Sequence, residues 1–73
     1  MRYKIYSESD GRPAVEYRET ADGAVLRAEY LIDHRGAAGV EIWDAQNPDR
    51  VYLPWQFHEL VQANGLNSRW VSQ

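Results

Sequence analysis

The 73-residue chain contains no cysteine. This excludes disulfide bonds and thiolate metal ligands, and it is typical of proteins from a reducing compartment. The sequence also lacks an apolar run of the roughly 18 residues that a membrane-spanning helix needs. Its beginning, MRYKIYSESD, soon turns polar and does not resemble a signal peptide. We therefore expect a cytoplasmic protein without a membrane segment.

An excess of charge of one sign is also missing, because 11 acidic and 8 basic residues give a net charge of −3. Domains that bind nucleic acid normally carry a basic surface, since phosphate contacts supply much of their affinity. The charge balance therefore disfavours nucleic acid as a partner. Lys4 is the one lysine, and the other basic residues are arginines, which favour specific forked contacts over diffuse attraction.

The motifs of the common enzyme classes are absent as well. The glycines match neither a phosphate-binding loop nor a dinucleotide fingerprint, and no serine lies in a Gly-x-Ser-x-Gly segment. The pairs Asp33-His34 and His58-Glu59 are adjacent in sequence, so they lack the spacing of four that places two ligands on one helix face. We expect no enzyme activity, no cofactor and no metal site.

What the sequence does contain begins with a predicted β-hairpin. Residues 2–7 and 14–19 alternate between apolar and polar side chains, as strands with one buried face do. The segment SDGRP between them carries an Asp-Gly pair, which is a strong local signal for a tight hairpin turn.

Residues 20–36 fit two patterns. An alternating pattern predicts a strand with Asp22-Gly23 as its turn, whereas a helical pattern gives an apolar stripe that includes Ala24 and Ala28. We favour the helix, because Thr20 or Asp22 can cap its start and Gly36 suits the left-handed position after its end.

Residues 39–44 and 50–54 are predicted to form two further strands. Asn47 and Pro48 lie between them, with Pro48 at the second position, which is the preferred chemistry of a type I turn. These strands therefore form a second antiparallel pair.

A short helix is predicted over residues 54–65, since Pro54 suits its first position and Asn64-Gly65 its end. Residues 67–73 follow as a tail anchored by Trp70. The order β-β-α-β-β-α predicts a single α+β domain of two layers, in which a four-stranded, mainly antiparallel sheet carries the long helix on one face. The short helix either joins the long helix or covers the other face.

Alternation divides the strand residues between the two faces of the sheet. The face toward the long helix is predicted to contain Tyr3, Ile5, Val15, Tyr17, Val40, Ile42, Val51 and Leu53. The opposite face is predicted to contain Lys4, Tyr6, Glu16, Arg18, Glu41, Trp43, Arg50 and Tyr52. Trp43 and Tyr52 are expected to pair across the second hairpin on this opposite face.

The opposite face has the composition of a protein interface, where Trp, Tyr and Arg supply most of the binding energy. We therefore predict a non-enzymatic interaction module that binds a protein partner or a second copy of itself. The predicted binding residues are Trp43, Tyr52, Arg50, Arg18, Tyr6 and Glu41.

Three alternatives stay open at this point. Residues 55–73 can cover the opposite face, which makes Trp43 and Tyr52 a second small core. The chain can be a stand-alone inhibitor or accessory protein of the kind that mobile elements encode, which blocks a larger complex. Aromatic side chains on an open sheet can also stack the bases of a single-stranded nucleic acid, although Glu16 and Glu41 would repel its phosphates.

Overall fold

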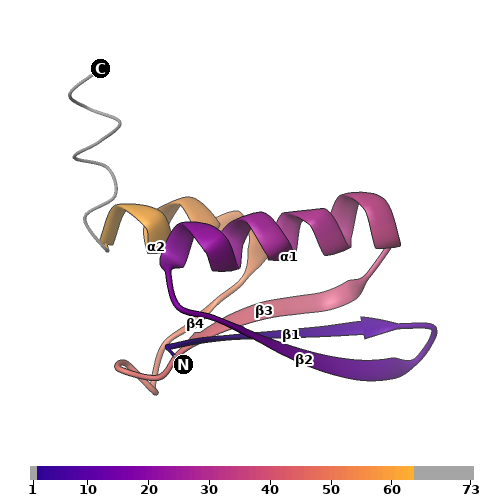
Figure 1. Cartoon of the computed structure of the whole chain (residues 1–73), viewed down its shortest axis with the longest axis horizontal. Coiled ribbons are helices and arrows are strands. Elements are labelled where there is room, and N and C mark those ends of the chain that lie inside the picture. The colour runs from indigo at the N-terminus through magenta and orange to yellow at the C-terminus, as the bar shows by residue number, and fades with distance from the viewer. Residues whose placement is uncertain (1, 64–73) are drawn as a thin grey trace.

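The computed structural model describes residues 2–63 and shows an α+β fold. Four antiparallel strands form one sheet in the order β2-β1-β3-β4, and a 15-residue helix packs on one face (Figure 1). The strands are β1 (Tyr3–Ser9), β2 (Arg12–Arg18), β3 (Ala38–Asp44) and β4 (Val51–Tyr52). The predicted fold class is therefore confirmed. None of the helices within residues 2–63 is long and apolar enough to cross a membrane.

The first hairpin turns at Asp10 and Gly11, as the sequence predicts. Both residues have positive φ, 54° and 75°, which is the backbone of a type I′ turn and explains the Asp-Gly pair. The two-residue turn places Ser9 opposite Arg12, and the pairing continues without interruption to Tyr3 opposite Arg18. The turn thus fixes which residues of β1 and β2 share a face.

Helix α1 (Ala21–Arg35) confirms the helical interpretation of this segment. Thr20 is the N-cap, with its hydroxyl oxygen accepting a hydrogen bond from the Gly23 N–H at 3.2 Å. Gly36 has φ 62° and donates its N–H to the Leu31 carbonyl, which closes the helix as a left-handed C-cap. The buried stripe includes three alanines, whose small side chains let the helix approach the sheet closely.

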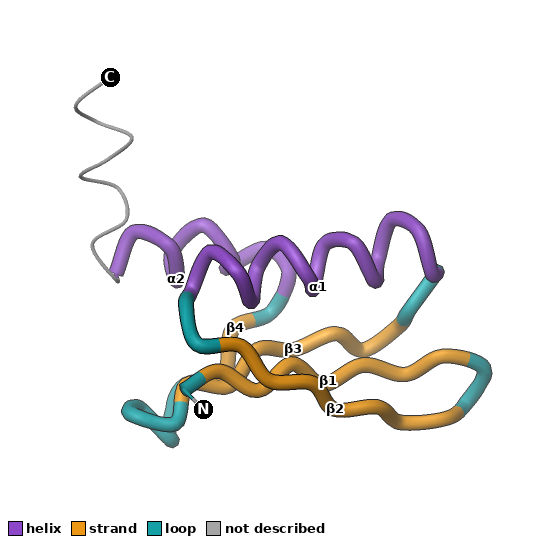
Figure 2. The backbone as a smooth tube through the Cα atoms, in the orientation of Figure 1, coloured by secondary structure: helices purple, strands orange, loops and turns teal. Residues whose placement is uncertain are grey.

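Two consecutive turns connect β3 to β4, at the opposite end of the sheet from the first hairpin turn (Figure 2). The second turn is closed by the Arg50 N–H, which donates to the Asn47 carbonyl at 2.8 Å. Pro48 therefore occupies the second position, as predicted. β4 is shorter than expected because Pro54 begins a 3₁₀ turn, η1 (Pro54–Gln56).

Helix α2 (Phe57–Ala63) follows η1 and lies beside α1 on the same face of the sheet (Figures 1 and 2). The described part of the short helix therefore joins the long helix and does not cover the other face. The predicted helix end at Asn64-Gly65, the tail over residues 67–73 and its anchor Trp70 lie outside the described residues.

One core lies between the helices and the sheet. The strands contribute Tyr3, Ile5, Val40, Ile42 and Tyr52. The helices contribute Ala21, Ala24, Val25, Ala28, Leu31, Phe57 and Leu60. Ala24 and Ala28 of the apolar stripe predicted for α1 are thus both buried.

For two strands, β2 and β4, the prediction of which residues point toward the helices is wrong. Since Ile5 points into the core and lies opposite Glu16, the even-numbered residues of β2 face the helices. Val15 and Tyr17 consequently point away from α1 and are 46% and 49% exposed.

The same reversal occurs in β4. Tyr52 lies opposite the fully buried Ile42 and is itself only 4% exposed, so it belongs to the core. Val51 lies opposite Trp43 and shares the outer face. Leu53, predicted to point inward from a strand, is partly buried and follows the end of β4.

Candidate functional site

The face of the sheet that points away from α1 and α2 is left uncovered by residues 2–63 (Figure 1). Residues that lie directly opposite each other on adjacent antiparallel strands share a face, so the pairing defines this surface. We call it the open face. Its two central rows comprise Lys4, Tyr6, Val15, Tyr17, Glu41, Trp43 and Val51, and Glu8 and Pro13 continue the face toward the first hairpin turn. Three of the seven side chains in the central rows are aromatic, and they come from three different strands.

The first row of the open face crosses the whole sheet from Tyr17 through Lys4 and Trp43 to Val51. The Lys4 ammonium lies 4.9 Å from the centre of the Trp43 ring, in cation–π geometry. Lys4 also has Tyr17 as its direct neighbour on the other side. A cation therefore lies between two aromatic side chains in the middle of an exposed surface.

The second row consists of Val15, Tyr6 and Glu41. The Trp43 indole Nε1 donates to the Glu41 carboxylate at 3.2 Å, which links the two rows and orients both side chains. The Tyr6 hydroxyl donates to Glu8 at 2.7 Å, and this bond raises the pKa of the Tyr6 phenol. These bonds orient the Tyr6 and Trp43 side chains on the open face.

A hollow of about 300 Å³ adjoins the first row at the end of the sheet that carries the turns after β3. It is lined by Arg2, Lys4, Tyr17, Trp43, Asp44, Ala45 and Pro48. The Arg2 guanidinium binds Asp44 through both Nε and Nη2, so this wall of the hollow carries no net charge. The hollow is large enough for one side chain and lies next to Lys4.

Three predicted binding residues lie together on the open face. Trp43, Tyr6 and Glu41 occupy adjacent positions on β3 and β1, and each is partly exposed. The structure thus brings together half of the predicted set on the surface for which it was predicted.

Tyr52 and Arg50 lie on the other side of the sheet, which corrects their predicted position. Tyr52 is buried, and the Arg50 guanidinium lies 5.0 Å from the centre of the Tyr52 ring. Arg50 also forms an exposed ion pair with Glu59 of α2 at 3.3 Å. These contacts tie the turn before β4 to α2, so the predicted pairing of Trp43 with Tyr52 does not occur.

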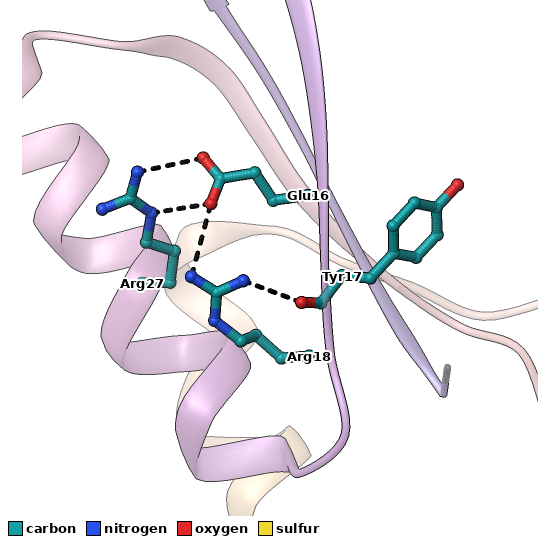
Figure 3. A network of polar contacts seen from close by, with 4 residues as sticks. All are labelled: Glu16, Tyr17, Arg18 and Arg27. Carbon is teal, nitrogen blue, oxygen red and sulfur yellow. Dashed lines mark hydrogen bonds and ion pairs between the residues drawn. The ribbon is translucent and has the colours of Figure 1, made fainter.

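Arg18 and Glu16 likewise lie on the helix side of β2, contrary to the prediction (Figure 3). Glu16 accepts from Arg27 of α1 at two oxygens, with distances of 2.9 and 3.1 Å, and this hydrogen bonding lowers the Glu16 pKa. Arg18 bonds Glu16 at 3.4 Å and donates to the Tyr17 carbonyl at 2.7 Å. Figure 3 shows the Tyr17 ring pointing to the opposite side of the strand.

Besides Val51 of β4, the prediction of the binding surface missed two residues of β2, Tyr17 and Val15. The signal for them was present in the Asp10-Gly11 turn, because a two-residue turn pairs position 9 with 12 and therefore 5 with 16. Since Ile5 lies in the core, this pairing places Glu16 on the helix side of the sheet and Tyr17 on the open face.

Within residues 2–63, no group of three or more His, Asp or Glu side chains converges in a way that could hold a metal ion. Comparisons with protein-family models, with curated proteins and with solved structures found no match. The geometry of the open face therefore carries the functional argument alone.

Proposed function

We propose that this protein is a non-enzymatic interaction module that binds a protein surface through its open face. The observation that supports this proposal is the row formed by Tyr17, Lys4 and Trp43 on the side of the sheet away from both helices, where Tyr17 is exposed and the other two are partly exposed. Aromatic side chains of this kind supply most of the binding energy in protein interfaces. Burying them against a partner removes apolar surface from water without disturbing the core on the other side of the sheet.

The chemistry of the open face also defines what the partner must offer. Apolar side chains fit against the aromatic rings, and a carboxylate fits against the Lys4 ammonium, which has no ion-pair partner among residues 2–63. Glu41 in turn suits a cationic or N–H group. A single-stranded nucleic acid is less suitable, because the one cation of the open face is balanced by Glu41.

The test compares two tryptophan variants. Trp43→Ala combined with Tyr17→Ala removes the two rings beside Lys4, whereas Trp55→Ala removes a 71% exposed tryptophan that lies outside the open face. We expect tagged wild-type protein and the Trp55 variant to recover the same protein partner, and the double variant to lose it. Circular dichroism must show that all three proteins are folded.

Retention of the partner by the folded double variant would contradict the proposal. Light scattering on the same samples measures self-association, which distinguishes a second copy of the chain from a different protein.

A further inference from the structure

The open face is also complementary to itself, and we propose that its partner is a second copy of this chain. The two copies pack face to face around a two-fold axis, with Lys4 of each copy against Glu41 of the other. This inference rests on the proposed function, because it uses the same surface and names its occupant.

The first step is that the two central rows of the open face carry one charge of each sign, Lys4 and Glu41, that lies outside any ion pair among residues 2–63. The ion pairs formed among residues 2–63 involve neither Lys4 nor Glu41. Lys4 contacts the Trp43 ring, and one Glu41 oxygen accepts from the indole N–H of the same tryptophan. Trp43 thus separates the two charges within one copy and leaves both available to another molecule.

The second step is the arrangement of four side chains on β1 and β3. Lys4 lies opposite Trp43, and Tyr6 lies opposite Glu41, so the four residues form the corners of a quadrilateral. The two charged residues occupy one diagonal, and the two aromatic residues occupy the other.

A two-fold axis that lies between two facing sheets, parallel to the aromatic diagonal, exchanges the two charged corners. Lys4 then meets Glu41 of the second copy at two symmetric places, while Trp43 and Tyr6 each lie near their own counterparts. A symmetric dimer needs such a self-complementary patch. The strands of the two sheets cross at a large angle in this arrangement, as in orthogonal sheet packing.

The third step is that the edge of the sheet is less suited to a second copy than its face. β2 has a free outer edge, but the Tyr17 carbonyl already accepts a hydrogen bond from the Arg18 guanidinium at 2.7 Å. Backbone groups alternate in direction along a strand, so Pro13 faces the same edge as Tyr17 and offers no N–H there. The other edge strand, β4, has only two residues.

The size of the open face sets the expected strength. Strands spaced about 4.8 Å apart and rising about 3.4 Å per residue give three seven-residue strands and one short strand a footprint of roughly 400 Å². With both copies counted this is about 800 Å², which is below the roughly 1,200–2,000 Å² of stable specific interfaces and in the range of weak, transient contacts. We therefore expect a dimer that dissociates on dilution through the micromolar range.

The test is a charge exchange followed by sedimentation and light scattering. Lys4→Glu and Glu41→Lys each place like charges against one another in the dimer, and each is expected to raise the dissociation constant about tenfold or more. An equimolar mixture allows a mixed dimer with one copy of each variant. In one of its two contacts, substituted position 4 of the first variant meets substituted position 41 of the second, which joins a carboxylate to an ammonium. The other contact joins Glu41 of the first variant to Lys4 of the second. We expect the mixture to form dimers where each variant alone does not.

Three outcomes would overturn the inference. One is a wild-type protein that stays monomeric up to about 1 mM, where even an association of about −4 kcal/mol is detectable. Another is a pair of folded variants that dimerise as the wild type does, and a third is a mixture that stays monomeric. Should one variant fail to fold, the other and the salt dependence of the wild-type dimer, which must weaken as salt rises, still decide the question.

The result also separates this inference from the proposed function. A monomeric wild type that binds a different protein in a Trp43-dependent manner contradicts the second-copy proposal alone. A dimer that survives the combined Trp43→Ala and Tyr17→Ala change has its contact elsewhere and contradicts the second-copy proposal. The proposed function is contradicted only if a different protein partner is also retained by this folded double variant.

Discussion

Arg2 and Asp44 are joined by a two-point ion pair across 42 positions of sequence, with Nε–Oδ1 and Nη2–Oδ2 distances of 3.0 and 3.1 Å. The Asp44 side chain is only 4% exposed. Its Oδ1 also accepts from the Gln46 N–H at 2.9 Å, so this carboxylate starts the turn after β3 and fastens the beginning of the chain to it. The Asp44 side chain thus links the beginning of the chain to the turn after β3, at the end of the sheet next to the open face.

The stability of the protein should fall in acid because of two carboxylates. Hydrogen bonds from Arg27 and Arg2 lower the pKa values of Glu16 and Asp44 from their ordinary 4.5 and 3.8. Their stabilisation is therefore complete above those ordinary values and is lost as the pH falls through the lower folded-state values. We expect the thermal midpoint of the wild type to decrease between about pH 5 and pH 3.

The combined Glu16→Gln and Asp44→Asn variant should have a lower midpoint at pH 7 and a flatter profile in acid. Glu29→Gln serves as the control, because Glu29 is exposed and forms no ion pair among residues 2–63. An unchanged acid profile in the double variant would show that other groups control the loss of stability.

Tyr52 and Trp43 should respond very differently to removal. Tyr52→Ala empties a place in the core and is expected to lower the free energy of unfolding by about 3–5 kcal/mol. Trp43→Ala leaves no cavity, because the ring lies on the open face, and it should cost about 1 kcal/mol or less. Denaturant unfolding of both variants measures the difference, and comparable losses would place both residues in the core.

The contrast between these residues shows how far the sequence predicts the structure. The helix caps, the hairpin turn and the apolar periods are local signals, and they predict the order of elements, the α1 stripe and the core of β1 and β3 correctly. The face of the sheet that a side chain occupies is set by the register, which depends on the pairing with the neighbouring strand. In β2 the register followed from the turn length. In β4 six residues separate the strands, and no local rule indicates that Tyr52 lies opposite Ile42.

The same limit applies to the candidate site. Trp43, Tyr6 and Glu41 belong to the two central strands, whose apolar residues report the facing directly, so their surface was predicted correctly. Arg18 lies in the edge strand β2, where alternation alone did not indicate which set of residues faces the helix. The charged set faces it, because Glu16 forms an ion pair with Arg27 of α1.

Gly23 and Thr20 should behave as a coupled pair. A Cβ on Gly23 would lie 2.9 Å from the Thr20 hydroxyl oxygen, so Gly23→Ala displaces the N-cap. Alanine normally stabilises a helix by about 1 kcal/mol relative to glycine, and we expect this stabilisation to be lost here. Thr20→Ala should cost about 1 kcal/mol through loss of the cap. In the Thr20→Ala background the Gly23→Ala change should become stabilising. A double-mutant cycle of unfolding free energies tests this, and strict additivity would contradict the steric explanation.

The outer edge of β2 should pair with strands of other molecules when Pro13 and Arg18, which protect it, are replaced. Pro13→Thr restores an N–H at this edge, and Arg18→Ala frees the Tyr17 carbonyl. We expect the double variant to form β-rich aggregates faster than the wild type, as measured by light scattering and thioflavin fluorescence. Arg12→Ala is the control, because its backbone groups point toward β1. Equal aggregation of all three proteins would show that the edge is protected by other means.

Both described helices lie on the same side of the sheet, and this has a consequence for how the molecule can diversify. The seven side chains in the central rows of the open face contribute nothing to the buried cluster, whereas the opposite positions of the same strands carry it. Neighbouring positions along a strand are therefore under separate constraints, because one set of positions is needed for the core and the other is not. The open face can accordingly be changed residue by residue, in evolution or in a randomised library, on an unchanged scaffold.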